Sequence, residues 1–441
     1  MSESSSVQPG AKTPLPEGTL PVAVGLFIAG FTAYAFFKVG QVALGKEDFK
    51  PIVALWFTTF ALVPGILMPV EQELGRALAH RRALLEGGRP VVRRMLPLAV
   101  GLTAMLIVVI AVIAPYMTRT MFEGHWIVTA ALIVTIISYT PMHLARGIAS
   151  GSGRFVTYGT IMGVDGATRI VACVVLWQLN VTSIGAYAFA VALSPLVAVL
   201  AVSKGRQLHT EPGPDASFSE ITPNLGWLLL GSVMAAGLVN AGPLGVDILA
   251  RSDQALLVTA FGNGVLLSRV PLFLFQAVQA SLLPRLARLA AKGDLDEFRE
   301  GFALLMKVVI AVAALGAIGS FVLGPWALEL VYEGGLDRRS LTILAIASGL
   351  YMIALATAQA VIALHGHRWV AMGWLSAMAS FLLVTAFSSD DLYLRVELGL
   401  VAGSLSACIV FAVALRSRIN AGATPDAESM IDGIMDTPFE G

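Results

Sequence analysis

The chain has 441 residues, of which 56% are hydrophobic and only 13% are charged. A soluble domain carries about 25% charged residues, so this composition excludes a water-soluble globular protein and indicates an integral membrane protein. The net charge is zero, from 29 basic and 29 acidic residues, which argues against a nucleic-acid partner.

Twelve segments are apolar enough and long enough to cross a bilayer, which takes about 20 residues. In chain order we expect helices over 20–44, 51–79, 95–117, 125–149, 155–179, 184–203, 221–248, 254–287, 299–331, 338–364, 368–388 and 393–416. Six lie on each side of a polar segment, 204–220, which we interpret as a cytoplasmic linker. The sequence therefore predicts an all-α multi-pass membrane protein with a six-helix lobe over 20–203 and a second over 221–416.

Two terminal segments fall outside these lobes. Residues 1–19 carry a single basic residue and precede an apolar run too long for a signal peptide, so we expect a disordered tail and a retained first helix. Residues 417–441 are rich in acids, and we expect a disordered tail there as well.

The basic residues predict the orientation in the membrane. Loops that follow even-numbered helices hold Arg81, Arg82, Arg89, Arg93, Arg94, Arg154, Lys204, Arg206, Arg288, Lys292 and Arg368, whereas loops that follow odd-numbered helices are richer in acids. Because basic loops stay in the cytoplasm, both termini are expected on the cytoplasmic side of the cell membrane.

The two lobes resemble each other in sequence. Arg154-Phe-Val-x-x-Gly159 at the start of the fifth helix matches Arg368-Trp-Val-x-x-Gly373 at the start of the eleventh. Two six-helix repeats in parallel orientation place a substrate site at the interface between the lobes.

Asp165 and Arg169 stand out because they lie deep inside the fifth predicted helix, four residues apart and on one face. Charge in a bilayer costs about 2.5–3.5 kcal/mol per residue, so such residues face a partner or a cavity. Two interpretations stay open. The residues form an intrahelical ion pair that neutralises both, or they line the transport cavity, where Arg169 binds an anion and Asp165 couples transport to an ion.

Arg269 lies near the middle of the eighth predicted helix, with no carboxylate within four residues. An unpaired arginine in the membrane is the best candidate for binding a phosphate group, through its planar and permanently charged guanidinium. The alternative is a pair with Asp247 of the preceding helix, which is itself a second candidate for ion coupling. Lys38, near the outer end of the first helix, either reaches the interface or contributes a third cation to an anionic head group.

Other charges lie near helix ends. For Glu71, Glu73, Arg76 and Arg146 we expect solvated positions or helix–helix ion pairs, and for Glu329 and Glu333 solvated ones. The chain shows no P-loop, no metal-spaced histidine cluster and no nucleophile elbow, so we expect neither an enzyme nor a metal or other cofactor.

Several segments resemble the MOP exporter superfamily, and in detail its polysaccharide flippase branch. They are Pro69-Val-Glu-Gln-Glu-Leu-Gly-Arg-Ala-Leu, Ala145-Arg-Gly-Ile-Ala-Ser-Gly-Ser-Gly-Arg-Phe, Leu267-Ser-Arg-Val-Pro271, Leu282-Leu-Pro-Arg-Leu286 and Leu323-Gly-Pro-Trp. The resemblance covers roughly residues 20–416.

The resemblance implies a V-shaped, alternating-access pair of bundles that flips a polyprenyl-pyrophosphate-linked oligosaccharide to the outer leaflet for surface polysaccharide synthesis. Arg269, Arg169 and Lys38 are the positions that could meet its pyrophosphate and sugar. Two alternatives stay open: a multidrug or cation antiporter of the same fold, with Asp165 or Asp247 as coupling acid, and a non-transporting membrane partner of polysaccharide-synthesis proteins.

Overall fold

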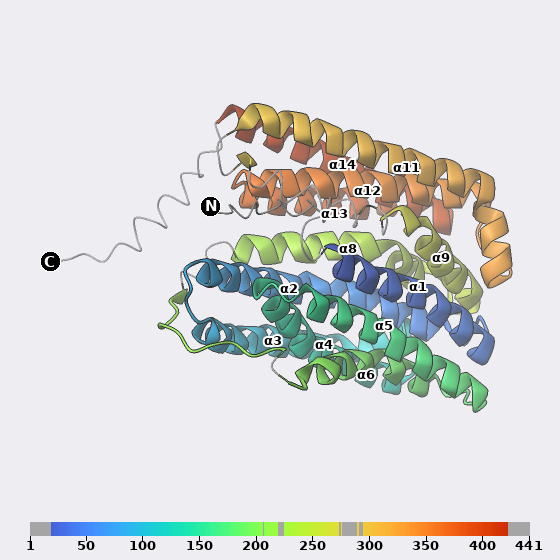
Figure 1. The fold of residues 1–441 in the computed structure, drawn as a ribbon. Helices are drawn as coiled ribbons and strands as arrows, with labels where there is room; N and C mark the ends of the chain where they lie inside the picture. Colours follow the sequence, from blue (N-terminus) through green and yellow to red (C-terminus); the bar gives the residue numbers. More distant parts are fainter. Residues whose placement is uncertain are drawn as a thin grey trace, which may run out of the picture.

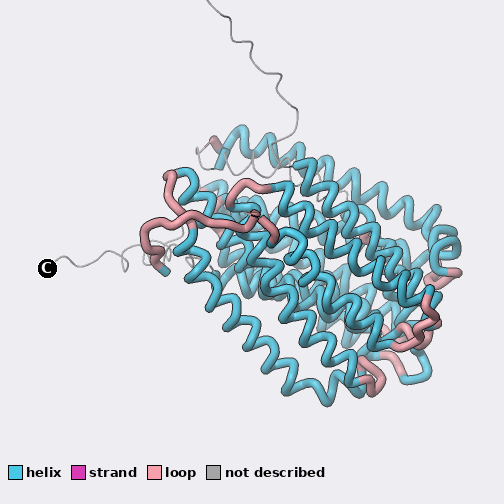
Figure 2. Tube along the Cα trace, turned by 60° about the horizontal axis from the view of Figure 1, so that its bottom comes forward, coloured by secondary structure: helices cyan, strands magenta, loops and turns pink. Residues whose placement is uncertain are grey.

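In a computed structural model of the chain, the structure describes residues 19–205, 207–218, 225–272, 275, 289–290 and 294–421. These residues form helices and connecting loops, with no strand among them (Figure 2). The helices are α1 Thr19–Leu44, α2 Lys50–Ala83, α3 Arg89–Thr120, α4 Trp126–Gly151, α5 Phe155–Gln178, α6 Ile184–Ser203, α8 Leu225–Leu249, α9 Ala255–Ser268, α11 Leu295–Tyr332, α12 Arg338–Ala363, α13 His367–Phe387 and α14 Leu392–Asn420. A short 3₁₀ turn, Ser252–Gln254, precedes α9.

Within the described residues, 12 helices are long and apolar enough to cross a membrane. The predicted all-α, multi-pass fold is therefore confirmed. The remainder of the predicted tails, residues 1–18 and 422–441, lies outside the described residues.

Several helices extend beyond their predicted ends because polar residues continue the helix past the apolar run. The clearest correction concerns α14, which reaches Asn420, so the first residues of the predicted acidic tail are helical. Arginine is a good helix former, and Arg418 donates from Nε to the carbonyl of Leu364 at 3.0 Å, which holds this last turn against the end of α12.

The eighth predicted helix, 254–287, is interrupted. α9 ends at Ser268, Arg269 lies in a turn, and residues 270–272 are helical again. Pro271 explains the break, because it lacks the N–H that would bond to the carbonyl four residues earlier. Most of the remaining predicted residues, 273–274 and 276–287, lie outside the described residues.

The helices pack as two groups, which we name the first lobe (α1–α6) and the second lobe (α8–α14). In the first lobe α1 packs on α5, and α4 packs on α2, α3, α5 and α6. In the second, α12 packs on α11 and α14, and α13 packs on α8 and α14. Contacts of α2 with α8 and α9 join the lobes. The first lobe lies below the second in Figure 1.

Glycines allow α1 and α5 to approach closely. A Cβ atom at Gly159 would lie 2.2 Å from the carbonyl oxygen of Pro21, and one at Gly25 would lie 2.4 Å from that of Gly159. In a membrane, small residues at such crossings let the backbones come within van der Waals distance. In the second lobe, Gly373 similarly leaves room for the ring of Phe411.

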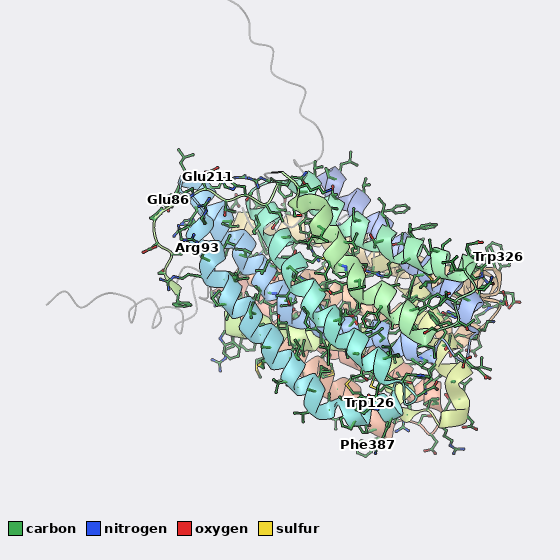
Figure 3. The ribbon with its side chains drawn as sticks, turned by 90° about the horizontal axis from the view of Figure 1, so that it is seen from below. Glu86, Arg93, Trp126, Glu211, Trp326 and Phe387 are labelled. Carbon is green, nitrogen blue, oxygen red and sulfur yellow. The ribbon has the colours of Figure 1, made fainter. Side chains whose placement is uncertain are left out.

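The two ends of the bundle differ in chemistry. We call the side that holds Thr19 and Ala421 the terminal side, and the opposite one the distal side. Figure 3 shows Glu86, Arg93 and Glu211 at the terminal side and Trp126 and Phe387 at the distal side. Exposed tryptophan at one end of an apolar bundle is typical of a membrane–water interface.

The described part of the predicted linker lies against the first lobe at the terminal side. Arg81 donates to the carbonyls of Pro214 at 2.6 Å and Asp215 at 3.1 Å. Further contacts are from Arg154 to the Gln207 carbonyl (2.6 Å), from Arg89 to the Thr210 carbonyl (3.2 Å), and from the Arg94 guanidinium to the Phe218 ring (4.8 Å). These arginines, which the sequence analysis placed in basic loops, lie at or next to the ends of α2, α3 and α5 and hold this segment in place.

Candidate functional site

Arg269 lies where α9 breaks, and its side chain is partly buried between the lobes. Its guanidinium donates to Asn240 Oδ1 at 3.2 Å and to the carbonyl of Val239, both on α8. From the other lobe, the ring of Phe57 on α2 lies 5.3 Å from the guanidinium carbon, in a cation–π contact.

The partners of Arg269 are neutral. Within the described residues, no carboxylate lies within ion-pair distance of it, and the alternative pair with Asp247 is not formed. A cavity of about 40 Å³ adjoins the guanidinium, lined by hydroxyl-bearing side chains (Ser268, Ser348, Tyr351 and Ser404) and by apolar residues of α8, α9, α12 and α14. The positive charge therefore has hydrogen-bond acceptors around it but no counter-ion among the described residues.

Asp247 lies at the distal end of α8, buried beside Lys50 of α2 with 3.5 Å between its carboxylate and the ammonium group. Lys50 also lies 3.2 Å from Glu123, in the loop after α3. Asp247 is thus part of an ion-pair cluster that joins the two lobes, rather than a free carboxylate in a cavity.

Asp165 and Arg169 form the intrahelical pair, 2.5 Å apart, in the core of the first lobe. Asp165 also accepts a hydrogen bond from Ser194 Oγ of α6 at 2.7 Å. Arg169 donates to the Tyr139 hydroxyl at 3.4 Å and stacks on Trp56, 4.8 Å from its ring. Both charges are buried among α2, α4, α5 and α6, and each already has polar partners.

Helix α2 lies between the two arginines. Trp56 contacts Arg169, and the next residue along α2, Phe57, contacts Arg269. Neighbouring helix positions point about 100° apart, so α2 separates the inside of the first lobe from the interface between the lobes. The structure therefore does not bring the predicted cations into a single site.

Lys38 takes part in a set of contacts that close the lobes against each other on the distal side. Its ammonium lies 3.0 Å from the carboxylate of Glu333, and Lys46 lies 3.9 Å from the same group. The hydrogen bond from Lys38 and the charges of both lysines hold the pKa of Glu333 below its usual range. The expectation that Glu333 is simply solvated is thus incomplete, since this exposed residue bridges the lobes.

A buried amide pair reinforces the same closure. Gln41 of α1 and Asn263 of α9 exchange two hydrogen bonds, at 2.7 and 3.0 Å. The hydroxyl of Tyr34 donates to the Leu266 carbonyl at 2.8 Å, and that of Thr259 to the Lys46 carbonyl at 2.9 Å. On its distal side, the described part of the molecule is closed between the lobes.

Sequence reasoning did not single out one buried network as a site. Glu71 of α2 contacts His143 at 2.7 Å and Arg146 at 3.1 Å, both on α4, and accepts a hydrogen bond from the Tyr158 hydroxyl at 3.1 Å. Of the two expectations for Glu71 and Arg146, the helix–helix pair is the one observed. The i, i+3 spacing of His143 and Arg146 was the available signal, since it puts both on one face of α4.

Glu397 is a second residue that the sequence analysis passed over. It is fully buried near the distal end of α14, and its carboxylate oxygens have no hydrogen-bond partner within the described residues. A lone glutamate five residues after the start of a helix gives no sign of how completely its neighbours will cover it. As for metals, no group of three or more His, Cys, Asp or Glu side chains is placed to hold an ion in the described part of the chain.

Comparisons with known proteins were made at the level of sequence and of structure. No family model matches the sequence. The chain is 24% identical over 415 residues to the uncharacterized protein Rv3630 of Mycobacterium tuberculosis, covering 89% of this chain and 91% of that one. It is 27% identical over 298 residues to the uncharacterized protein Rv1510 of the same species, covering 63% and 64%.

Solved structures are similar over almost the whole chain. One is the outward-facing conformation of a multidrug resistance MATE family transporter of the MOP superfamily, with a TM-score of 0.69, 15% identity, and coverage of 92% of this chain and 95% of that one. Another is the inward-facing conformation of such a transporter, with a TM-score of 0.66, 16% identity, and coverage of 94% and 97%. The chain therefore has the fold of MATE transporters, and these neighbours are transporters rather than enzymes.

Proposed function

We propose that this protein is a membrane transporter whose cargo carries an anionic group that binds Arg269. The observation that carries the proposal is a partly buried guanidinium at the interface between the lobes, held by neutral acceptors and without a carboxylate within ion-pair distance in the described residues. An uncompensated charge in such surroundings is costly, and an incoming anion would relieve that cost.

A polyprenyl-pyrophosphate-linked oligosaccharide suits this site. Arginine binds phosphate through two parallel hydrogen bonds, and the serine and tyrosine hydroxyls beside Arg269 could bond to sugar or phosphate oxygens. The cavity of about 40 Å³ holds only one or two water molecules. Cargo binding would therefore require the contact between Arg269 and Phe57 of the other lobe to open. Arg169 and Lys38 would play smaller parts, since Asp165 and Glu333 already neutralise them.

A multidrug antiporter is the second candidate, because the structural neighbours include transporters described as multidrug resistance proteins. In that case Asp165 or Asp247 would bind the coupling ion. Each is now paired with a cation, so protonation would have to release Arg169 or Lys50. The positive charge of Arg269 at the interface favours an anionic cargo over a cationic drug.

The test uses the full-length protein reconstituted in liposomes with a fluorescent polyprenyl-pyrophosphate disaccharide. We expect Arg269→Gln to slow its movement between leaflets by about 10- to 100-fold, the value of one charge-assisted hydrogen bond, and Arg269→Lys to retain part of the rate. Arg119→Gln, an exposed arginine at the end of α3, is the matched control and should behave as the wild type.

Two results would contradict the proposal. One is an unchanged rate in Arg269→Gln protein that is folded and inserted normally. The other is no flipping by the wild type together with efflux of a cationic dye such as ethidium that depends on Asp165 or Asp247, which would establish the antiporter instead.

A further inference from the structure

A groove runs along the lipid-facing side of the second lobe, between α11 and α14. Both helices pack on α12, but within the described residues α11 and α14 do not pack closely on each other. The space between them forms a cavity of about 460 Å³ with α12 as its floor. Ligand-binding cavities in proteins are typically about 300–1,000 Å³, so this one is large enough for part of a lipid.

The walls of the groove come from one face of each helix. They are Phe302 and Met306 of α11, Ile353 and Thr357 of α12, and Cys408, Ala412, Leu415 and Ile419 of α14. The only polar groups among them are internally bonded: Thr357 donates to the Ile353 carbonyl at 2.8 Å, and Cys408 to the Leu350 carbonyl at 3.2 Å. These walls offer van der Waals contact and no hydrogen bond to a polar occupant.

The mouth of the groove, in contrast, is basic. Arg299, four residues into α11, and Arg416, four residues before the end of α14, line it at the terminal side, together with Asn420. Arg299 bonds to Asp296 at 2.7 Å, but both side chains are exposed, and such pairs contribute little. At 1.5 Å per residue, the groove reaches about 18 Å from the end of α14 to Cys408, close to half of a 30 Å bilayer core.

We propose that this groove binds an anionic phospholipid of the leaflet on the terminal side, which is the leaflet predicted to be cytoplasmic. The phosphate lies between Arg299 and Arg416, and one acyl chain lies along Phe302, Met306 and Leu415. Basic sites between membrane helices on the cytoplasmic side bind anionic head groups, and the depth of the groove matches one leaflet. The inference requires only that the protein lies in a bilayer, so it does not depend on the proposed function.

The experiment measures the thermal stability and lipid retention of the purified full-length protein in mild detergent. We expect phosphatidylglycerol to raise the melting temperature by several degrees and to remain bound in native mass spectrometry. Phosphatidylcholine and inorganic phosphate at equal concentration should have much smaller effects. Equal stabilisation by phosphatidylcholine would overturn the proposal, and so would stabilisation by inorganic phosphate alone.

Variants locate the site. Arg299→Gln/Arg416→Gln should lose at least tenfold in retention of phosphatidylglycerol, and Ala412→Trp, which fills the groove without changing its charge, should lose retention too. Arg93→Gln removes an exposed arginine at the terminal side of the first lobe and should bind like the wild type. Undiminished retention in both groove variants would place the bound lipid elsewhere and refute the assignment.

Discussion

Asp165 and Arg169 illustrate how far single residues could be read from the sequence. Their spacing of four put both on one helix face and left two interpretations open, an ion pair or a lining of the cavity, and the ion pair is present at 2.5 Å. The sequence could not show that Ser194 and Trp56 complete their surroundings, because those residues come from other helices. The same limit applies to Lys38 and Glu333, which are 295 residues apart and meet only through lobe packing.

We predict that Asp165→Asn is strongly destabilising on its own. It leaves the Arg169 charge buried without its counter-ion, which typically costs about 3–5 kcal/mol. Replacing both residues, in Asp165→Leu/Arg169→Leu, should recover most of the melting temperature measured in detergent, because neither charge then remains.

A transport assay of the double variant distinguishes a structural role of the ion pair from a role in transport. A stable and active double variant identifies a structural pair. A stable but inactive one would show that one of the charges serves transport, and a single variant as stable as the wild type would contradict the structural account altogether.

At the level of helices, the apolar segments were predictable because the bilayer fixes both their length and their composition. Their ends were less so, since α11 and α14 continue through polar residues that a hydropathy criterion leaves out. The break at Arg269 could be anticipated from Pro271. The attachment of residues 207–218 to the first lobe could not, because Arg81 and Arg154 bind backbone carbonyls, and any sequence would offer those.

The crossing of α1 and α5 gives a prediction at this scale. Gly159→Leu places a side chain where the Pro21 carbonyl now lies, so the helices must separate. Overpacking of this kind costs about 1–3 kcal/mol, and we expect a clearly lower melting temperature in detergent.

Gly101→Leu on α3 is the matched control. A Cβ atom there meets nothing within 4 Å, so the leucine should be tolerated. Equal melting temperatures for the two variants would mean that the close approach of α1 and α5 does not matter for stability.

At the scale of the whole molecule, the described residues close the distal side between the lobes, and the hydrogen-bonded pair Gln41 and Asn263 is part of that closure. In protein whose native Cys173 and Cys408 have been replaced, we predict that a short bis-methanethiosulfonate reagent will join Gln41→Cys to Asn263→Cys. The bridge should arrest transport, because the lobes must separate there to open the distal side. Cleavage with a reducing agent should restore it.

Each single-cysteine variant, treated with the same reagent, controls for modification of the thiol itself. Continued transport by the bridged protein would show that the distal contacts stay closed throughout the cycle. In that event, alternating access would require the lobes to separate at a place other than these distal contacts.

The attachment of residues 207–218 to the first lobe also limits how far the lobes can part. Because Arg94 stacks on Phe218, only the seven peptide steps from Phe218 to Leu225 connect this attached segment to α8. A fully extended chain of that length spans about 24 Å. While the segment stays attached, the polypeptide is a short tether, and the start of α8 cannot move farther than this from the terminal face of the first lobe, whatever cargo enters between them.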